Sequence, residues 1–192
     1  MFTRYADDWV VIWNGSRERA EEIKSEIKTF LSDELRLRLS EEKTLITHID
    51  DGFDFLGYHI VGSKRWSDGQ WCLFSRVPQK AIRRFRDAVK EITRKTFTDE
   101  VAAFTALSGL IRGWGNYYAY AAESRLMDSL DAFVYQQMWQ YCWHKNKDIG
   151  AKAIFQKYTL PRSLRQVGHF QLGLVVGEQV VRIPRLSSIP RK

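Results

Sequence analysis

The chain has 192 residues, of which 44% are hydrophobic and 14% aromatic, and it carries a formal net charge of +7 at pH 7. A chain of this length can bury roughly 70% of its unfolded surface, enough for one large domain or two small ones. It has no apolar run of the ~18 residues that a membrane span requires and no signal-peptide pattern. Its two cysteines exclude a disulfide framework. We therefore expect a cytoplasmic protein that does not interact with membranes.

The charge is unevenly distributed along the chain. Residues 1–80 carry 12 Lys and Arg against 14 Asp and Glu, whereas residues 81–192 carry 18 against 9. A basic surface attracts polyanions because each phosphate that it neutralises releases a bound counterion. Seven tryptophans add rings on which bases can stack. The C-terminal half is therefore the candidate nucleic-acid-binding part, with a merely solvated basic surface as the alternative.

The first predicted elements are a β-hairpin and an amphipathic helix. Phe2–Tyr5 and Trp9–Trp13 have the composition of short strands, with two acidic residues between them. Ser16 follows an Asn-Gly turn and suits the N-cap of a helix. Apolar residues then recur at helical spacing until about Asp33.

Further strands are predicted before Pro78. Thr44–Ile49 and Phe53–Val61 are rich in β-branched and aromatic residues. Trp66–Val77 is predicted to form a hairpin around a Ser-Asp-Gly turn. Residues 1–79 are therefore expected to form an antiparallel sheet with one covering helix.

After Pro78 the apolar spacing changes from 2 to 3.6, which predicts three helices. The first follows Pro78, and the others span about residues 99–122 and 124–143. The predicted apolar faces are Ile82, Phe85, Val89 and Ile92; Val101, Phe104, Leu107 and Ile111; and Leu126, Leu130, Phe133 and Met138. The tail has a β-leaning stretch at Phe170–Val181. The expected fold is thus α+β, with a partial sheet in residues 1–79, three helices in residues 80–148 and a short extension in residues 149–192.

The acidic pair Asp7-Asp8 is a candidate metal site. Adjacent carboxylates on a tight hairpin can bind hard cations such as Mg²⁺ through oxygen. In a two-metal polymerase, such cations assist attack by a primer hydroxyl and stabilise the leaving pyrophosphate. Two carboxylates make an incomplete site, however, and an ordinary Asp-Asp turn is the alternative.

The segment Gly109–Tyr118 is the second candidate site. It contains three glycines, each of which weakens a helix by up to ~1 kcal/mol, so a close approach of another backbone, helix or RNA strand is expected there. Trp114 and Tyr118 suit the apolar core on the face of Ile111. The better contact candidates project elsewhere and are Arg112, Asn116 and Tyr117.

Three motifs in residues 1–60 resemble the later motifs of group II intron reverse transcriptases. They are Tyr-Ala-Asp-Asp at residues 5–8, Leu-Ser-Glu-Glu-Lys-Thr at residues 39–44 and Phe-Asp-Phe-Leu-Gly-Tyr at residues 53–58. The resemblance implies that residues 1–79 are the end of a polymerase palm. It also implies a catalytic, metal-binding role for Asp7 and Asp8, a template–nucleotide site lined by Tyr5 and Ala6, a triphosphate neighbour in Lys43 and a primer grip formed by Phe55, Leu56, Gly57 and Tyr58. A solvated Lys43 and a bulge glycine at position 57 are the alternatives.

A second group of motifs resembles the maturase-specific domain of the same family. It comprises residues 107–118, 126–135 and 138–143. The resemblance implies that residues 80–148 are a helical thumb that grips intron RNA or a template–primer duplex. The candidate RNA-binding residues are then Arg83, Arg84, Arg86, Lys90, Arg94, Arg112, Asn116, Tyr117, Lys145 and Lys147.

The resemblance implies a fragment of a reverse transcriptase/maturase that binds intron RNA and template–primer. The fingers and a third catalytic Asp belong to the preceding part of such enzymes, so we expect the 192-residue chain alone to be inactive as a polymerase. A separate chain that carries those parts could complete the Mg²⁺ site. The alternatives are a non-enzymatic RNA-binding fragment that supports intron splicing, a folded remnant without an independent role, and, outside this family, a DNA-binding helical module.

Overall fold

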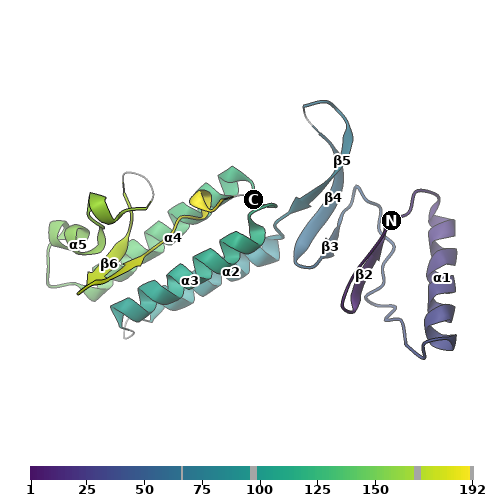
Figure 1. The fold of residues 1–192 in the computed structure, drawn as a ribbon, viewed down its shortest axis with the longest axis horizontal. Helices are drawn as coiled ribbons and strands as arrows, with labels where there is room; N and C mark the ends of the chain where they lie inside the picture. The colour runs from purple at the N-terminus through teal and green to yellow at the C-terminus, as the bar shows by residue number, and fades with distance from the viewer. Residues whose placement is uncertain (66, 96–98, 167–169, 191–192) are drawn as a thin grey trace. The chain divides into compact units, whose positions relative to one another are not determined.

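The computed structural model describes residues 1–65, 67–95, 99–166 and 170–190. Over these residues the chain contains five α-helices, two short 3-10 helices and three small antiparallel sheets, so the predicted α+β class is confirmed (Figure 1). Contacts divide the chain into two compact units, Met1–Arg76 and Val77–Lys192. Each unit has its own elements and is described by itself.

The first unit begins with a two-stranded hairpin and a helix. Strands β1 (Phe2–Tyr5) and β2 (Asp8–Val11) pair antiparallel, and helix α1 spans Arg17–Asp33. The side chain of Ser16 accepts a hydrogen bond from the backbone N–H of Arg19, which satisfies one of the free donors at the helix start. The predicted hairpin and helix are therefore confirmed, although the second strand ends earlier than expected.

The second sheet of this unit has the order β3-β4-β5, formed by Phe53–Phe55, Tyr58–Lys64 and Trp71–Arg76. The prediction of a single strand over Phe53–Val61 was wrong, because Leu56 and Gly57 have φ angles of +48° and +74° and turn the chain. These two residues instead form the tip of the β3–β4 hairpin. The β4–β5 hairpin turns at Ser67-Asp68-Gly69 as predicted, while Trp66 lies outside the described residues.

The predicted strand at Thr44–Ile49 was also wrong. The backbone N–H and the hydroxyl of Thr44 both donate to the carbonyl of Ser40, and the carbonyl of Thr44 accepts from the Lys24 ammonium. Its polar groups are thus satisfied locally rather than by a neighbouring strand. β-propensity records how well a side chain fits a pleated surface, and it does not supply a pairing partner.

Burial in the first unit is slight. Among its described residues only Gly62 is buried, and α1 has no buried residue. The large apolar side chains of Phe2, Tyr5 and Phe30 are more than half exposed, at 64%, 66% and 55%. The described part of this unit therefore has hydrogen-bonded strands and a capped helix but no buried apolar core.

The second unit is built on three helices, α2 (Gln79–Arg94), α3 (Glu100–Tyr118) and α4 (Ser124–Lys145). On α2 and α3, the predicted residues that are fully buried are Phe85, Val89, Phe104, Leu107 and Ile111. On α4, two of the four predicted residues are fully buried, Leu130 and Met138. Leu126 and Phe133 were wrongly predicted as core and are half-buried, and Ile92 of α2 and Val101 of α3 are half-buried as well. Met127 and Val134, one position further along α4, are buried instead, so the buried face of α4 is rotated from the predicted one.

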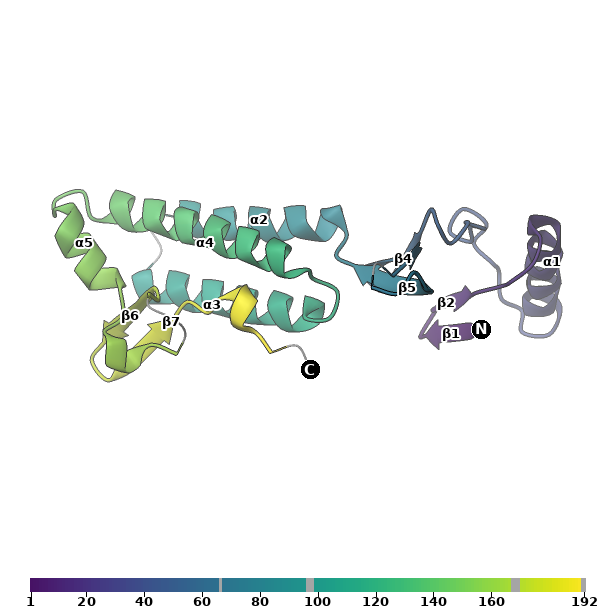
Figure 2. The same ribbon diagram turned by 90° about the horizontal axis from the view of Figure 1, so that it is seen from above.

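The remainder of the second unit folds back onto the helices. Helix α5 (Ala151–Tyr158) is followed by a short 3-10 helix (Arg162–Leu164), the hairpin of β6 (Gly173–Val176) and β7 (Gln179–Arg182), and the 3-10 helix η2 (Leu186–Ser188). Figure 2 shows this hairpin beside α3, and contacts join β7 to α3 and η2 to α4.

Two contacts fix η2 in place. The carboxylate of Asp131 on α4 accepts from the backbone N–H groups of Leu186 and Ser187, at 2.7 and 3.0 Å. On α3, a Cβ at Gly115 would lie 2.1 Å from Cδ1 of Ile189 and 2.9 Å from Cδ2 of Leu186. The absence of a side chain at position 115 therefore lets the tail pack directly on α3.

Candidate functional site

The acidic hairpin presents its carboxylates to solvent. Tyr5 pairs with Asp8, which leaves Ala6 and Asp7 as the two turn residues, and all four are exposed. Ala6 has a φ of +49°, a left-handed conformation that L-residues other than Gly, Asn and Asp rarely adopt. The Arg4 guanidinium donates to the carbonyl of Ala6 at 2.8 Å and so braces the turn.

A metal ion would need more ligands than this tip supplies. No group of three His, Cys, Asp or Glu side chains suited to a metal ion occurs in the parts of the chain that the structure describes. Asp7 and Asp8 therefore fit the role of two ligands in a shared site, but they do not form a complete one. No catalytic step follows from these two carboxylates alone.

The β3–β4 hairpin has the same construction as the acidic hairpin. Phe55 pairs with Tyr58, and Leu56 and Gly57 make the turn, both with positive φ. Two-residue hairpin turns with positive φ at both positions favour Asn and Gly, so Leu56 is under strain there. Gly57 serves the turn itself, which corrects the expectation that it lies within a strand. Both candidate motifs thus sit at hairpin tips whose first turn residue has a side chain and a positive φ.

An interaction beside this second tip was not predicted from the sequence. Asp54 and His59 are cross-strand partners, and Nδ1 of His59 lies 2.8 Å from the Asp54 carboxylate. Recognition of the turn at Leu56-Gly57 would have placed these two residues opposite each other. Lys43 lies in an exposed turn, where its backbone N–H donates to Ser40. The described residues show no extensive packing between the two hairpins.

The basic residues of α2 have three different environments. Arg83, Arg84 and Arg94 are exposed, as a nucleic-acid contact requires. Lys90 is half-buried, 3.8 Å from the carboxylate of Asp87. Arg86 is also half-buried, with its guanidinium 5.6 Å from the ring of Phe133 on α4 and a buried Nε that has no hydrogen-bond partner within the described residues. The geometry of Arg86 thus suits helix packing as much as ligand binding.

The glycines of α3 serve two purposes. A Cβ at Gly109 or Gly113 would meet nothing within 4 Å, whereas Gly115 faces the tail. Arg112 and Asn116 are exposed, and Tyr117 is 49% exposed. One face of α3 therefore combines bare backbone with a cation, an amide and a phenol ring.

The two aromatic residues that suited the core do lie inward. Trp114 is half-buried, with ring centroids 4.9 Å from Phe85 and 4.7 Å from Tyr118. Burial raises the pKa of Tyr118, and the charge of Arg84 acts on it in the opposite direction. The contact between Phe85 and Trp114 places this part of α2, which also carries Arg84, beside the C-terminal half of α3.

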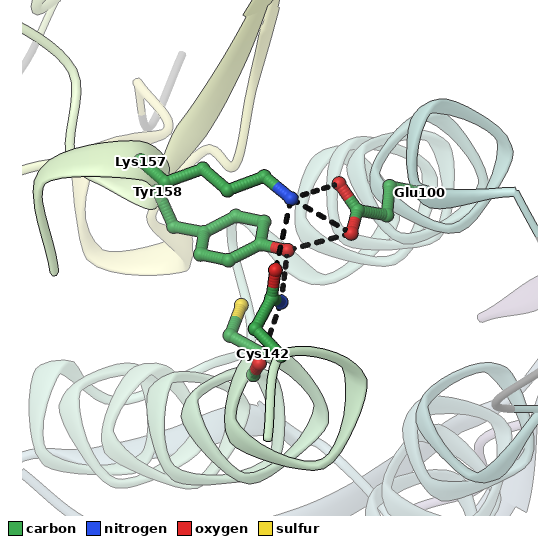
Figure 3. A network of polar contacts seen from close by, with 5 residues as sticks. Glu100, Cys142, Lys157 and Tyr158 are labelled. Carbon is green, nitrogen blue, oxygen red and sulfur yellow. Dashed lines mark hydrogen bonds and ion pairs between the residues drawn. The ribbon is translucent and has the colours of Figure 1, made fainter. Parts of the chain in front are cut away.

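A partly buried polar network fixes the end of α4. The Tyr158 hydroxyl donates to the Glu100 carboxylate at 2.7 Å, and the Lys157 ammonium lies 3.1 Å from the same carboxylate (Figure 3). Asn146 donates to the Tyr158 hydroxyl at 2.6 Å and to the carbonyl of Cys142 at 2.8 Å. Burial, together with the Glu100 carboxylate, raises the pKa of Tyr158. The network orients the adjoining segment, in which Lys145 is half-buried and Lys147 exposed.

Two protein-family models match the chain. The model of the group II intron maturase-specific domain matches residues 82–159, and that of reverse transcriptase (RNA-dependent DNA polymerase) matches residues 1–60. The chain belongs to the group II intron reverse transcriptase/maturase family. The reverse transcriptase match spans both hairpin tips, and the maturase match spans the residues from Arg83 to Lys147 that were predicted to bind RNA. Reverse transcriptases as a class are polymerases that depend on divalent metal ions.

Curated relatives support this assignment. The chain is 40% identical over 84 residues to protein YkfC of Escherichia coli and 48% identical over 59 residues to the group II intron-encoded protein LtrA of Lactococcus lactis. These alignments cover 44% and 31% of the chain. It is also 29% identical over 138 residues, 62% of its length, to an uncharacterised 91 kDa protein in the cob intron of Schizosaccharomyces pombe. The chain spans 22%, 10% and 17% of these three relatives.

None of the helices in the described residues is both long enough and apolar enough to cross a bilayer.

Proposed function

We propose that the second unit binds RNA through the exposed faces of α2 and α3. The observation that supports this most directly is the face of α3 on which a Cβ added at Gly109 or Gly113 would meet nothing within 4 Å, with Arg112 and Asn116 exposed beside these glycines. Glycine within a helix lowers stability by about 1 kcal/mol relative to alanine. Two such glycines at open positions favour a ligand whose backbone approaches the helix closely.

The chemistry of this surface suits a phosphate backbone. Guanidinium groups bind phosphate oxygens in a bidentate manner, and amide and phenol groups donate to phosphate, sugar and base edges. Arg83 and Arg84 are exposed on the part of α2 whose Phe85 contacts Trp114 of α3, so they add positive charge beside this surface. Because LtrA is a group II intron-encoded protein, intron RNA is the proposed ligand class, and supporting intron splicing is the proposed role.

Binding of labelled intron RNA, followed by fluorescence anisotropy at several salt concentrations, tests this proposal. The double variant R83E/R84E should lower the affinity about tenfold or more and should reduce the slope of log affinity against log salt by about 1 to 2. The matched control D7A/D8A changes two exposed charges outside this surface and should bind as the unaltered chain does. Equal binding by R83E/R84E would show that the basic face of α2 is not the contact surface.

A second proposed activity, RNA-directed DNA polymerisation, is favoured by the two hairpin tips. Asp7 and Asp8 would supply two ligands for Mg²⁺, with Tyr5 and Ala6 beside the template–nucleotide site and Lys43 near the triphosphate. Residues 55–58 would hold the primer. The positive φ angles of Ala6 and Leu56 support this assignment, because strained non-glycine residues cluster at functional sites.

Primer extension with Mg²⁺ or Mn²⁺ tests this second activity. Because the described residues contain only part of a metal site, the chain alone should extend no primer. Addition of a polypeptide that carries the fingers and the third catalytic Asp should restore extension, and D7A should abolish it. Extension by the chain alone that is lost in D7A would contradict the incomplete-site argument.

A further inference from the structure

Five aromatic side chains form a connected cluster on the outer side of α4, which we call the aromatic surface. Trp139 is at its centre, with ring centroids 6.3 Å from Tyr135, 6.4 Å from Trp143 and 6.1 Å from Phe155 of α5. The ring of Phe170 lies 5.5 Å from both Tyr135 and Phe155. Three segments of the second unit therefore contribute rings to one surface.

This surface is not part of the core. Tyr135, Trp143 and Phe155 are 41%, 40% and 43% exposed, whereas the neighbouring buried positions of α4, Met138 and Cys142, are 0% exposed. Trp139 and Phe170, which join these three rings, are half-buried. Scattered exposed apolar residues are ordinary, but several partly exposed rings joined into one cluster are typical of an interaction site. The rings contact one another at mixed angles, stacked between Tyr135 and Trp139 and edge-on between Trp139 and Trp143.

The polar groups around the rings indicate what kind of partner fits. On α4, each of Tyr135, Trp139 and Trp143 is followed directly by an exposed polar residue, namely Gln136, Gln140 and His144. Helix α4 has no acidic residue after Asp131. Between positions 132 and 165 the chain carries six Lys and Arg residues and only one acid, Asp148. Lys152 is exposed and precedes Phe155 by three residues on α5, so these two side chains share one side of the helix.

From this juxtaposition of exposed rings, amides and excess positive charge, we infer that the aromatic surface binds unpaired bases of an RNA strand by stacking. Single-stranded nucleic acid is bound by aromatic rings for the bases together with cations for the backbone. A duplex would leave the rings unused, because its bases are stacked internally. A basic peptide would be repelled by the surrounding charge. The inference rests on the proposed RNA binding and adds a second contact surface that selects single-stranded segments.

The experiment compares the affinity of the full chain for a labelled 20-nucleotide oligo(U) and for an RNA duplex of equal length. The double variant W143A/F155A should lower the affinity for oligo(U) by about 10- to 100-fold, since each stacked base contributes about 1–3 kcal/mol. Its duplex affinity should stay within about twofold of the unaltered chain. W143Y retains a ring and should bind oligo(U) nearly as well as the unaltered chain does, whereas W143L retains only apolar volume and should not.

The outcomes separate this inference from the proposed function. If W143A/F155A binds oligo(U) normally while R83E/R84E weakens duplex binding, the stacking surface is wrong and the proposed function stands. If the unaltered chain binds neither RNA, both fail. If the unaltered chain dimerises in sedimentation and W143A/F155A is monomeric, the surface is an interface between copies, which also overturns the inference. Equal circular dichroism and melting temperature of the variants exclude misfolding as the cause of a lost affinity.

Discussion

Leu56 has an unfavourable backbone conformation for a non-glycine residue, because its φ is positive, as are those of Ala6 and Arg36 in the described chain. A bulky side chain at φ +48° brings Cβ close to the carbonyl oxygen, which costs about 1–2 kcal/mol. Leu56→Gly should therefore stabilise the β3–β4 hairpin by about 1 kcal/mol. Slower amide hydrogen exchange in β3 and β4 is the measurement that checks this. Leu56→Ala keeps Cβ and serves as the matched control, so an equal gain in that variant would contradict the strain argument.

Cys142 links stability to pH. Burial raises the pKa of its thiol to about 12, from an ordinary value near 9. Between pH 9 and pH 12 the unfolded chain releases this proton while the folded chain retains it. The contribution of the buried neutral thiol to the free energy of unfolding is therefore fully present below pH 9 and is lost as the pH rises through about 12. Cys142→Ala should flatten the fall in the free energy of unfolding across that range, as measured by urea titration at each pH.

The same burial predicts chemical inertness. At pH 8 the native chain should be alkylated by iodoacetamide at Cys72, which is half-buried, before Cys142, which is 0% exposed. Both thiols should react in urea, as seen by mass spectrometry. Rapid labelling of Cys142 in the native chain would show that the network around Tyr158 opens readily.

At the scale of elements, α3 provides a matched pair of glycines. Gly113→Ala places a methyl group in open space and should stabilise the helix by up to about 1 kcal/mol. Gly115→Ala places it 2.1 Å from Cδ1 of Ile189 and 2.9 Å from Cδ2 of the buried Leu186, and should destabilise by about 1–3 kcal/mol. Urea unfolding distinguishes the two, and similar effects would argue against the packing of the tail.

If the proposed contact of α3 with RNA holds, Gly113→Ala should at the same time weaken RNA binding. A gain in stability with a loss of affinity is the expected signature of a glycine kept for close approach. Unchanged affinity would remove Gly113 from the contact surface.

The elements that the sequence predicted well are those with long periodic patterns. α2, α3 and α4 repeat apolar residues over four or more turns, and α1 has both a cap and a stripe. The turn at Leu56-Gly57 was missed because Leu is an improbable residue at positive φ, so Phe53–Val61 resembled one continuous strand. Thr44–Ile49 had strand composition but lacked a pairing partner, which composition does not reveal.

For the candidate site, the sequence predicted the residue types but not the tertiary contacts between elements. The motif residues at both hairpin tips and along α3 were identifiable by type, and the exposure of Arg112 and Asn116 agrees with their predicted outward direction. The packing of Arg86 on Phe133 depends on the rotation of α4, which was predicted one position off. The aromatic surface requires α5 and Phe170 to meet α4, and such tertiary contacts leave no periodic signal in the sequence.

At the scale of the whole molecule, the two units differ in how much of each is buried. The described part of the first unit buries only Gly62, whereas the second has a core of fully buried aliphatic and aromatic residues. Because apolar burial supplies most of the free energy of folding, the second unit should be far more stable. Amides in α3 and α4 should exchange much more slowly than those in β1, β2 and α1. Equal protection would contradict this prediction.

Limited proteolysis offers an independent check of the same contrast. A protease at low concentration should cleave within residues 1–76 first and leave a resistant fragment that begins near Val77. That fragment, produced by itself, should unfold cooperatively in urea. Early cleavage within α2 to α4 would show that the helical core depends on the preceding residues.

The contact between α3 and the tail limits which substitutions this protein can accept during evolution. Position 115 and position 189 compete for the same volume, since a methyl group at the first would overlap the end of the side chain at the second. A larger residue at 115 should therefore be tolerated only beside a smaller one at 189, so that Ile189→Ala rescues Gly115→Ala. Among homologous maturases these two positions are expected to exchange size in compensating pairs.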